Sequence, residues 1–337
     1  MSVARFVGTV VDRVIEAPVV TSFTNIGYQV RSRLSGWDDV GNVSVRGRTV
    51  IVTGGTSGLG LATAEGLAEL GAHVVITGRK RERADSVADQ INQSLAASTP
   101  GGLGSVSGLG ADMGELDAVR TLAADLLANH PTIDVLVHNA GALTANRREN
   151  SAGIEATVAS QVFGPFLLTS LLLERIGRSN PQKPGRVLSM SSGGMYSAGL
   201  TVSGLEMSGA EYGGSEQYAR AKRAQVTLNE MWAERVSGTD VVFHAMHPGW
   251  ADTPGVAESL PKFRKIVGPL LRTPEQGADT MVWLAAADEP GSCSGEFWLD
   301  RTRRSIHKLP TTKRTDTPER RQELWNRCVE VTGAIIP

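Results

Sequence analysis

A tyrosine and a lysine four residues apart, Tyr218 and Lys222, are well suited to acid/base chemistry. In a helix, positions i and i+4 share a face, so the ammonium would lie close to the phenol. A neighbouring positive charge stabilises the phenolate and lowers the pKa of the tyrosine, and such a group can exchange a proton with a carbonyl or carbinol oxygen. The spacing also fits a solvated pair on a helix surface. The other tyrosines have no lysine four residues on: Tyr28, Tyr196 and Tyr212.

Two serines, Ser191 and Ser192, end an apolar run that begins at Arg186. We expect this run to be a strand of a parallel sheet, and ligands bind at the carboxyl ends of such strands. A serine hydroxyl placed there can hydrogen-bond a substrate oxygen. The alternative is that both serines only form the turn that follows the strand.

A glycine-rich turn follows the β-branched run at 49–52, with glycines at Gly54, Gly58 and Gly60 and a leucine-rich helical pattern after them. Backbone N–H groups at a helix start point outward, and the helix dipole favours negative charge. Strand, turn and helix together predict a phosphate site. The spacing Thr-Gly-x-x-x-Gly-x-Gly differs from the Gly-x-Gly-x-x-Gly fingerprint of many dinucleotide folds, and a glycine turn without a ligand is the alternative.

Strand-like and helix-like segments alternate along most of the chain, which predicts a parallel, doubly wound α/β sheet. Thr273 and the proline after it predict a capped helix start. We expect strands at about 49–52, 71–77, up to 112, 133–138, 186–192, 241–247 and 296–299, and helices at about 59–70, 81–95, 151–177, 216–236 and 274–287.

The two ends of the chain carry further helical patterns. Apolar residues recur at helical spacing over 3–17, and a second stripe follows at Val19, Val20, Phe23, Ile26, Val30 and Leu34. We expect these helices to pack on the main domain; contact with a membrane surface or a second subunit is the alternative. Residues 35–48 read as a polar linker. The tail at 300–313 reads as basic and irregular, and Thr317 caps a last helix.

Composition excludes several classes of function. The 337 residues carry a net charge of −1, so nothing indicates a nucleic-acid partner. Cys293 and Cys328 have neither metal nor redox spacing, so we expect no metal site and reduced thiols. No apolar run reaches the length of a membrane span, and a secretory signal is not expected. The expected location is the cytoplasm.

Taken in order, these motifs resemble the short-chain dehydrogenase/reductase family over about residues 47–300. The resemblance implies a single Rossmann-type domain with helical extensions at 1–46 and 301–337. It implies that Ser192 polarises a carbonyl, that Tyr218 is the general acid/base, and that Lys222 tunes Tyr218 and holds the nicotinamide ribose. The wide gap between Ser192 and Tyr218 is similar to the retinol-dehydrogenase-like branch.

The resemblance also implies a dinucleotide site. Asp112 matches the residue that contacts adenine, and 139–141 match the segment along the adenine ribose. Pro248, Gly249 and Thr253 match the segment that grips the nicotinamide carboxamide. Besides Tyr218 and Lys222, the expected cofactor-binding residues are Thr53, Gly54, Thr56, Ser57, Gly58, Leu59, Gly60, Arg79, Lys80, Asp112, Met113, Asn139, Ala140, Gly141, Pro248, Gly249 and Thr253.

The second strand indicates which cofactor is used. Enzymes of this family that use NAD end this strand with an acidic residue, whereas this chain has Arg79 and Lys80 there, with Arg83 behind. A guanidinium can hold a 2′-phosphate through a charge-assisted bidentate pair. The sequence therefore predicts NADP (NADPH) rather than NAD.

One position departs from the family pattern. An asparagine normally completes a proton relay three residues before a glycine, and here Gln161 stands before Gly164. Glutamine keeps the amide on a side chain one methylene longer, so we expect either a slower relay or a shifted helix.

The resulting prediction is an NADP-dependent oxidoreductase for an apolar carbonyl or alcohol. Residues 254–272 would form a lid, with walls from Val256, Leu260, Phe263, Ile266, Val267, Leu270 and Leu271, although such a stripe serves equally well as core. The alternatives are a catalytically weak or inactive NADP-binding regulator or scaffold, peripheral membrane contact through residues 3–34, and a homo-oligomer.

Overall fold

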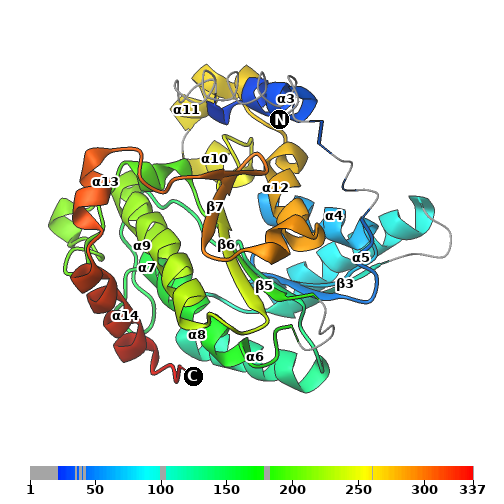
Figure 1. The fold of residues 1–337 in the computed structure, drawn as a ribbon, viewed down its shortest axis with the longest axis horizontal. Coiled ribbons are helices and arrows are strands. Elements are labelled where there is room, and N and C mark those ends of the chain that lie inside the picture. Colours follow the sequence, from blue (N-terminus) through cyan, green and yellow to red (C-terminus); the bar gives the residue numbers. More distant parts are fainter. Residues whose placement is uncertain are drawn as a thin grey trace.

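A computed structural model describes residues 22–34, 36, 37, 40, 43–98, 104–177, 183–259 and 261–336. Eight strands of this part form one sheet in the order β3-β2-β1-β4-β5-β6-β7-β8 (Figure 1). The first seven are parallel, and β8 runs antiparallel to β7. The strands are β1 (Thr49–Val52), β2 (His73–Gly78), β3 (Ser105–Gly110), β4 (Val135–His138), β5 (Gly185–Met190), β6 (Val241–Met246), β7 (Glu296–Leu299) and β8 (Thr302–Arg304).

The predicted doubly wound sheet is confirmed, with a core on each face. Because side chains alternate along a strand, Val50 and Val52 of β1 join one core while Ile51 joins the other. Helices α4 (Gly58–Glu69), α5 (Arg81–Ser98) and α12 (Pro274–Ala286) cover the first face. The second is covered by α6 (Leu116–Asn129), α8 (Gly164–Leu172) and α9 (Gly214–Arg235).

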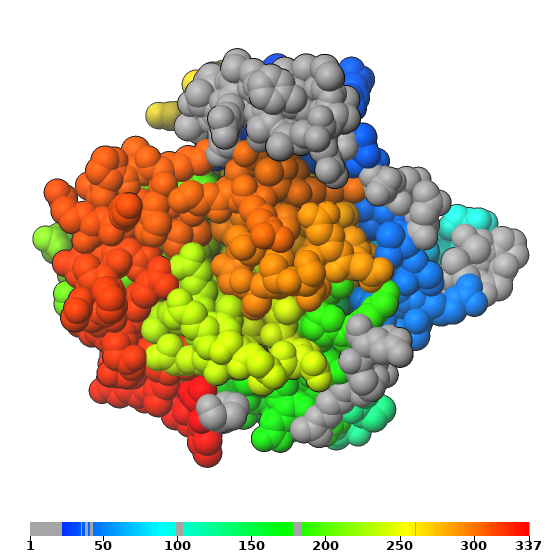
Figure 2. All heavy atoms as spheres, viewed as in Figure 1, coloured from blue at the N-terminus to red at the C-terminus, as the bar shows by residue number. Residues whose placement is uncertain are grey.

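The C-terminal helix α14 (Pro318–Thr332) is part of the second core. Its Trp325 lies edge-on to Trp232 and Phe166, with ring centroids 4.8 and 5.0 Å apart. The predicted caps are present, since Thr317 accepts a hydrogen bond from the Arg320 amide and Thr273 forms a capping box with Gln276. Figure 2 shows α14, in red, continuing the surface formed by α9.

Three regions of the chain differ from the sequence prediction. Helix α6 was not expected, and the tail expected to be irregular contains β8 and α13 (Pro310–Thr315). The helix expected at 151–177 is divided into α7 (Ala156–Val158), a π-helical turn (Ala159–Phe163) and α8. Pro165 explains the division: it has no N–H for the carbonyl four residues earlier, and its ring displaces that carbonyl. The Gly164 amide therefore bonds the Ala159 carbonyl, as in a π turn.

The N-terminal segment packs differently from its apolar stripe. The helix predicted at 3–17 lies outside the described residues. In the second segment, Phe23 is buried, but Ile26 and Leu34 of α3 (Asn25–Leu34) are exposed. The buried positions of α3 are Gly27 and Arg31. In the expected polar linker, Val45 is buried. None of the described helices is both long and apolar enough to cross a bilayer.

Candidate active site

The candidate site begins where the strand order reverses, at the carboxyl ends of β1 and β4. Thr53 joins the two strands: its hydroxyl donates to the Val137 carbonyl over 3.2 Å. The same oxygen accepts hydrogen bonds from the amides of Asn139 and Ala140, at 3.0 and 3.1 Å. Thr53 therefore fixes the glycine turn against the segment that follows β4.

Asn139 shapes the glycine turn directly. Its side-chain amide donates to the carbonyls of Thr53 and Gly54 at 2.9 and 3.0 Å. A Cβ on Gly60 would come within 2.3 Å of the same nitrogen, and Gly54 has a φ of +66°. Glycine is thus required at both places, by close approach at one and by conformation at the other. The Asn139 side chain braces the turn, while the expected contact with a ribose stays a prediction.

The start of α4 offers donors to an anion. Ser57 occupies the N-cap position, but its side chain makes no capping hydrogen bond. The first amides of an α-helix have no partner within the helix, so those of Gly58, Leu59 and Gly60 are available. Thr253 approaches this turn, since a Cβ on Gly58 would lie 3.4 Å from the Thr253 Cβ. These residues fit the pyrophosphate of a dinucleotide.

Two cations lie at the end of β2. Arg79 and Lys80 are exposed, and in the described part of the chain neither side chain makes a hydrogen bond or an ion pair. The neighbouring cations differ: Arg81 pairs with Asp85, and Arg83 donates to the Thr56 carbonyl over 3.4 Å. Thr56 itself packs against Gly78, where a Cβ would lie 2.7 Å from its methyl group.

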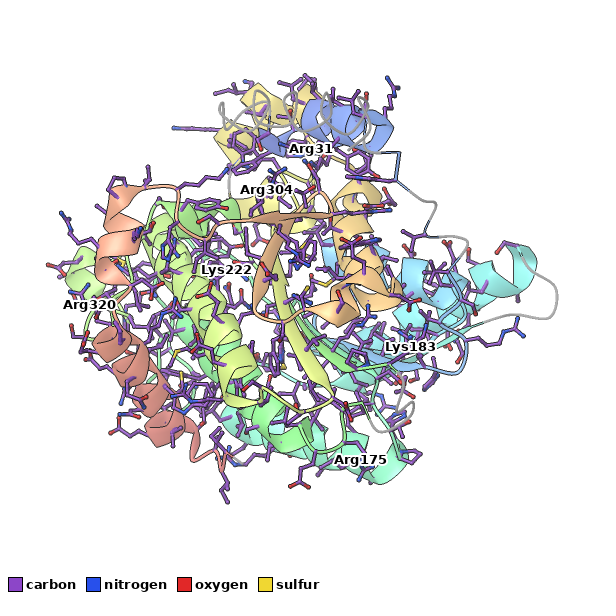
Figure 3. All side chains as sticks on the ribbon, in the orientation of Figure 1. Arg31, Arg175, Lys183, Lys222, Arg304 and Arg320 are labelled. Carbon is purple, nitrogen blue, oxygen red and sulfur yellow. The ribbon has the colours of Figure 1, made fainter. Side chains whose placement is uncertain are left out.

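Ser192, Tyr218 and Lys222 converge from β5 and α9. Ser192 follows β5 and accepts the Gly194 amide over 3.2 Å, and a Cβ on Gly194 would lie 3.6 Å from the Ser192 hydroxyl and 3.8 Å from the Tyr218 ring, so both groups lie beside this glycine. The Lys222 ammonium lies 5.5 Å from the centre of the Tyr218 ring and occupies the space between α9 and the sheet (Figure 3). Ser191 is buried and its hydroxyl has no partner among the described residues, so Ser192 is the serine that meets the tyrosine.

The electrostatics of this group differ from the sequence prediction. Burial raises the pKa of Tyr218, against a smaller lowering by the hydrogen bond to Ser192. Burial also lowers the pKa of Lys222 to about 7. A partly neutral ammonium placed over the ring cannot offset the desolvation of the phenol. In the free protein, burial therefore outweighs the effect of Lys222, and the lowering expected from Lys222 together with a bound nicotinamide stays a prediction.

Lys222 is held by two acceptors on the protein. Its ammonium donates to the Met190 carbonyl over 2.8 Å and to Gln225 Oε1 over 3.2 Å. An ammonium has three N–H donors, so one remains for a ribose hydroxyl.

Gln161 lies beneath the site in the π turn and is fully buried. Its Nε2 donates to the Ala142 carbonyl over 2.9 Å, whereas Oε1 has no partner among the described residues. Two more buried atoms without a described partner, His138 Nδ1 and Asn229 Oδ1, belong to residues that line the same cavity of about 30 Å³. This volume holds about one or two waters, and Gln225 on its wall connects it to Lys222.

The sequence analysis missed His138, Gln225 and Asn229. A signal for the last two existed, because positions 218, 222, 225 and 229 follow spacings of four, three and four and so share one face of α9. His138 gave no such signal. Burial lowers its pKa to about 3, so it is neutral, and its Nε2 pairs with the Thr169 hydroxyl at 2.8 Å.

The remaining predicted residues surround the turn. Asp112 accepts the Gly114 amide over 2.9 Å, and the buried Met113 lies against Gly164. Pro248 and Gly249 follow β6 and are buried, with Gly249 at a φ of +74°. Their contacts with a dinucleotide stay predictions.

The predicted lid consists of α10 (Pro254–Ser259), α11 (Pro261–Val267) and a 3₁₀ turn (Gly268–Leu270). Ile266 is 81% exposed and Leu271 is buried, and the assignment of these residues to a pocket wall stays a prediction. Phe263 packs on Trp250, with ring centroids 5.0 Å apart. Val256, Val267 and Leu270 are half-buried, and Leu260 lies outside the described residues. Ser259 joins the lid to the Leu143 carbonyl.

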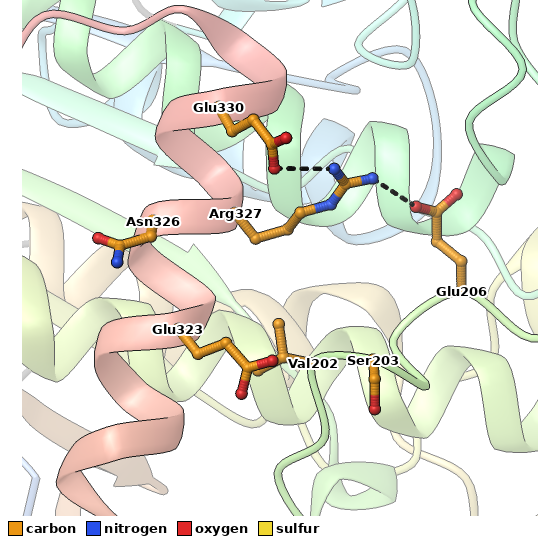
Figure 4. Close-up of a pocket in the computed structure, with 7 residues that line it drawn as sticks. All are labelled: Val202, Ser203, Glu206, Glu323, Asn326, Arg327 and Glu330. Carbon is orange, nitrogen blue, oxygen red and sulfur yellow. Dashed lines mark hydrogen bonds and ion pairs between the residues drawn. The ribbon is translucent and has the colours of Figure 1, made fainter.

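A larger hollow, of about 560 Å³, lies between α14 and residues 202–206 (Figure 4). Its Arg327 pairs with Glu330 and Glu206, and Glu323 adds a third carboxylate. None of the predicted catalytic or cofactor-binding residues lines it, so it is separate from the candidate site.

Comparison with known proteins agrees with this geometry. The sequence pattern of the family described as short chain dehydrogenase matches residues 48–263. The chain is 33% identical over 311 residues to dehydrogenase/reductase SDR family member 12 of Bos taurus, covering 90% of this chain and 91% of the relative. It is 32% identical over 270 residues to retinol dehydrogenase 14 of Homo sapiens, covering 76% and 79%. A 3-oxoacyl (acyl-carrier-protein) reductase from Agrobacterium tumefaciens, solved with NADP bound, is 26% identical with a TM-score of 0.59, covering 75% of this chain and 93% of that one.

Proposed function

The chain belongs to the short chain dehydrogenase family of oxidoreductases, and on that premise we propose that it is an NADP-dependent reductase or dehydrogenase acting on an apolar carbonyl or alcohol. The observation that carries the proposal is the convergence of Ser192, Tyr218 and Lys222 at the carboxyl end of β5, two strands from β1 and its glycine turn. These groups come from different elements and serve no evident packing purpose together.

NADP is proposed because of the free cations at the end of β2. Arg79 has no carboxylate partner among the described residues, so its guanidinium is available to a 2′-phosphate. The α4 amides would hold the pyrophosphate, and Lys222 the nicotinamide ribose. When bound, the nicotinamide supplies or accepts the hydride. The NADP-bound reductase of similar fold is consistent with this choice.

The protein's own residues hydrogen-bond the substrate oxygen and exchange a proton with it. Ser192 is placed to hydrogen-bond a carbonyl oxygen, which draws charge toward it. Tyr218 passes its proton to that oxygen during reduction and takes it back during oxidation. The ammonium of Lys222, together with the positive nicotinamide, favours the phenolate. Lowering the pKa of a tyrosine from about 10 to about 7 requires roughly 4 kcal/mol, and the raised pKa of Tyr218 without ligands makes the bound cofactor essential to this step.

An apolar substrate is proposed from the lid and from the relatives. Trp250 and Phe263 form an aromatic pair beside residues 254–270, and one relative is named a retinol dehydrogenase. A screen in which only small polar sugars turn over would contradict this substrate class.

The test of the function is NADPH oxidation with a panel of carbonyls, comparing wild type with Tyr218→Phe. We expect turnover to fall about 100- to 10,000-fold in the variant, with NADPH binding retained because the ring stays in place. If the wild type binds NADPH but no carbonyl of the panel supports its oxidation, the protein is the alternative, a non-catalytic regulator or scaffold.

Peripheral membrane contact is a separate proposal. Ile26 on α3 and Ile266 on α11 are exposed, and Lys262 and Lys265 near Ile266 are exposed as well. Exposed apolar side chains with lysines beside them suit an anionic lipid surface. Sedimentation with liposomes tests it, and Ile266→Asp should release the protein if the contact exists.

A further inference from the structure

We propose that residues 22–34 support the active site, with Arg31 and Phe23 as positioning residues for the two segments that flank it. The inference rests on the proposed function, because it assigns the segments after β5 and β6 to that site. Two independent sets of contacts carry it.

The first set is a buried charge network. Asp300 accepts from Arg272 at both carboxylate oxygens, at 2.6 and 2.9 Å, and from Arg31 at 2.7 Å. None of the three side chains is more than 3% exposed. Burial alone would raise the pKa of Asp300, but Arg272 and Arg31 hold it below its ordinary value. Arg31 also donates to the Ser22 carbonyl over 2.9 Å, so the network ties α3 to the end of β7.

Arg272 connects this charge network to the segment after β6. It donates to the Pro248 carbonyl over 3.3 Å, and a Cβ on Gly249 would lie 2.2 Å from its Nε. Only glycine leaves room for the guanidinium, and the φ of +74° favours glycine too. The Trp250 amide donates to the Phe23 carbonyl over 2.7 Å. The segment expected to grip the carboxamide is thus bonded directly to the N-terminal segment.

The second set runs from Phe23 to the catalytic serine. The Phe23 ring meets His247 edge-on, with centroids 4.3 Å apart. Burial lowers the pKa of His247 to about 3, so the ring is neutral, and its Nδ1 accepts the Gly193 amide over 3.1 Å. Gly193 follows Ser192 in the chain. Phe23 therefore supports, through one histidine, the backbone that aims Ser192.

Both sets start in one short segment; the first ends on the segment after β6 and the second on the segment after β5. Figure 3 shows Arg31 between α3 and the body of the molecule. Helix α3 differs from a helix that only rests on the surface, because the large side chain that it buries is the charged Arg31.

The test compares Arg31→Gln with Arg33→Gln in the full chain. Arg33 is an exposed arginine on the same helix and serves as the matched control. Asp300 keeps Arg272 in the Arg31 variant, so the fold should persist. We expect amide hydrogen exchange at Trp250 to rise about tenfold or more and the KM for NADPH to rise about tenfold. Arg31→Lys should restore part of both, and Arg33→Gln should change neither.

Phe23→Ala provides a second arm. It should lower kcat more than it changes the KM for NADPH, because it acts on the serine side. If the wild type shows no carbonyl turnover, the proposed function fails. Hydrogen exchange at Trp250 still tests whether residues 22–34 hold the segment after β6. Wild-type exchange at Trp250 in Arg31→Gln, with an unchanged KM wherever turnover is measurable, overturns the inference.

Discussion

The Lys222 ammonium lies over the Tyr218 ring, 5.5 Å from its centre, while donating to the Met190 carbonyl. The lysine is therefore anchored to the strand β5, and the tyrosine is raised in pKa rather than lowered. A further positive charge nearby is needed to lower the pKa of Tyr218. Under the proposed function, the protonation of Lys222 and the binding of the dinucleotide would depend on each other.

We predict that NADPH binding takes up a proton at pH 8. The pKa of Lys222 is about 7 in the free protein, so at pH 8 the amine is mostly neutral. The negative phosphates of the ligand favour the ammonium and raise this pKa, so affinity should fall as the pH rises above about 7. Calorimetry in buffers of different ionisation enthalpy measures the proton uptake.

The control for this prediction is Lys222→Arg. A guanidinium stays charged over this pH range, so the variant should bind without the proton uptake. Equal uptake in the variant and the wild type would show that another group titrates.

Arg79→Gln should weaken NADPH without weakening NADH. Losing a hydrogen-bonded charge costs about 1.5 to 3 kcal/mol, or about 10- to 100-fold in KM. Arg46→Gln removes an exposed arginine elsewhere and is the control. A wild type that clearly prefers NAD contradicts the cofactor assignment.

Gln161→Asn should destabilise the protein without speeding turnover. The shorter side chain cannot keep its 2.9 Å hydrogen bond to Ala142, and it leaves a buried carbonyl unsatisfied beside the cavity. We expect a loss of about 1 to 3 kcal/mol, measured by urea unfolding. A variant with unchanged stability and unchanged turnover would show that the departure from the family asparagine has no kinetic weight.

Trp325→Ala should show that α14 is part of the folded core. Trp325 is 5% exposed and contacts Phe166 and Trp232. Removing a large buried aromatic costs about 3 to 5 kcal/mol, which thermal or urea unfolding reveals. Ile335→Ala, at a side chain that is 90% exposed, should change stability little. Wild-type stability in Trp325→Ala would mean that these contacts of α14 do not stabilise the core.

Local pattern was enough for the seven parallel strands and for the order of the chemical groups. The β-branched run at 49–52, the glycines after it and the proline-capped helix at Thr273 depend on neighbours in sequence, and each was found where predicted. Pro165 was also visible, but its effect was not, because the π turn forms only where the widened helix can still pack.

The direction of the Tyr218 pKa, the buried face of α3 and the partners of Gln161 were decided by the tertiary structure. Helical spacing placed Lys222 beside Tyr218, but burial, which depends on the rest of the chain, raises the pKa of Tyr218 and lowers that of Lys222. Apolar spacing favoured Ile26 as a core residue, but Arg31 is buried instead by its pair with Asp300, which lies 269 residues further along the chain. Periodicity reports which residues share a face, whereas desolvation and ion pairing depend on what the rest of the chain brings against that face.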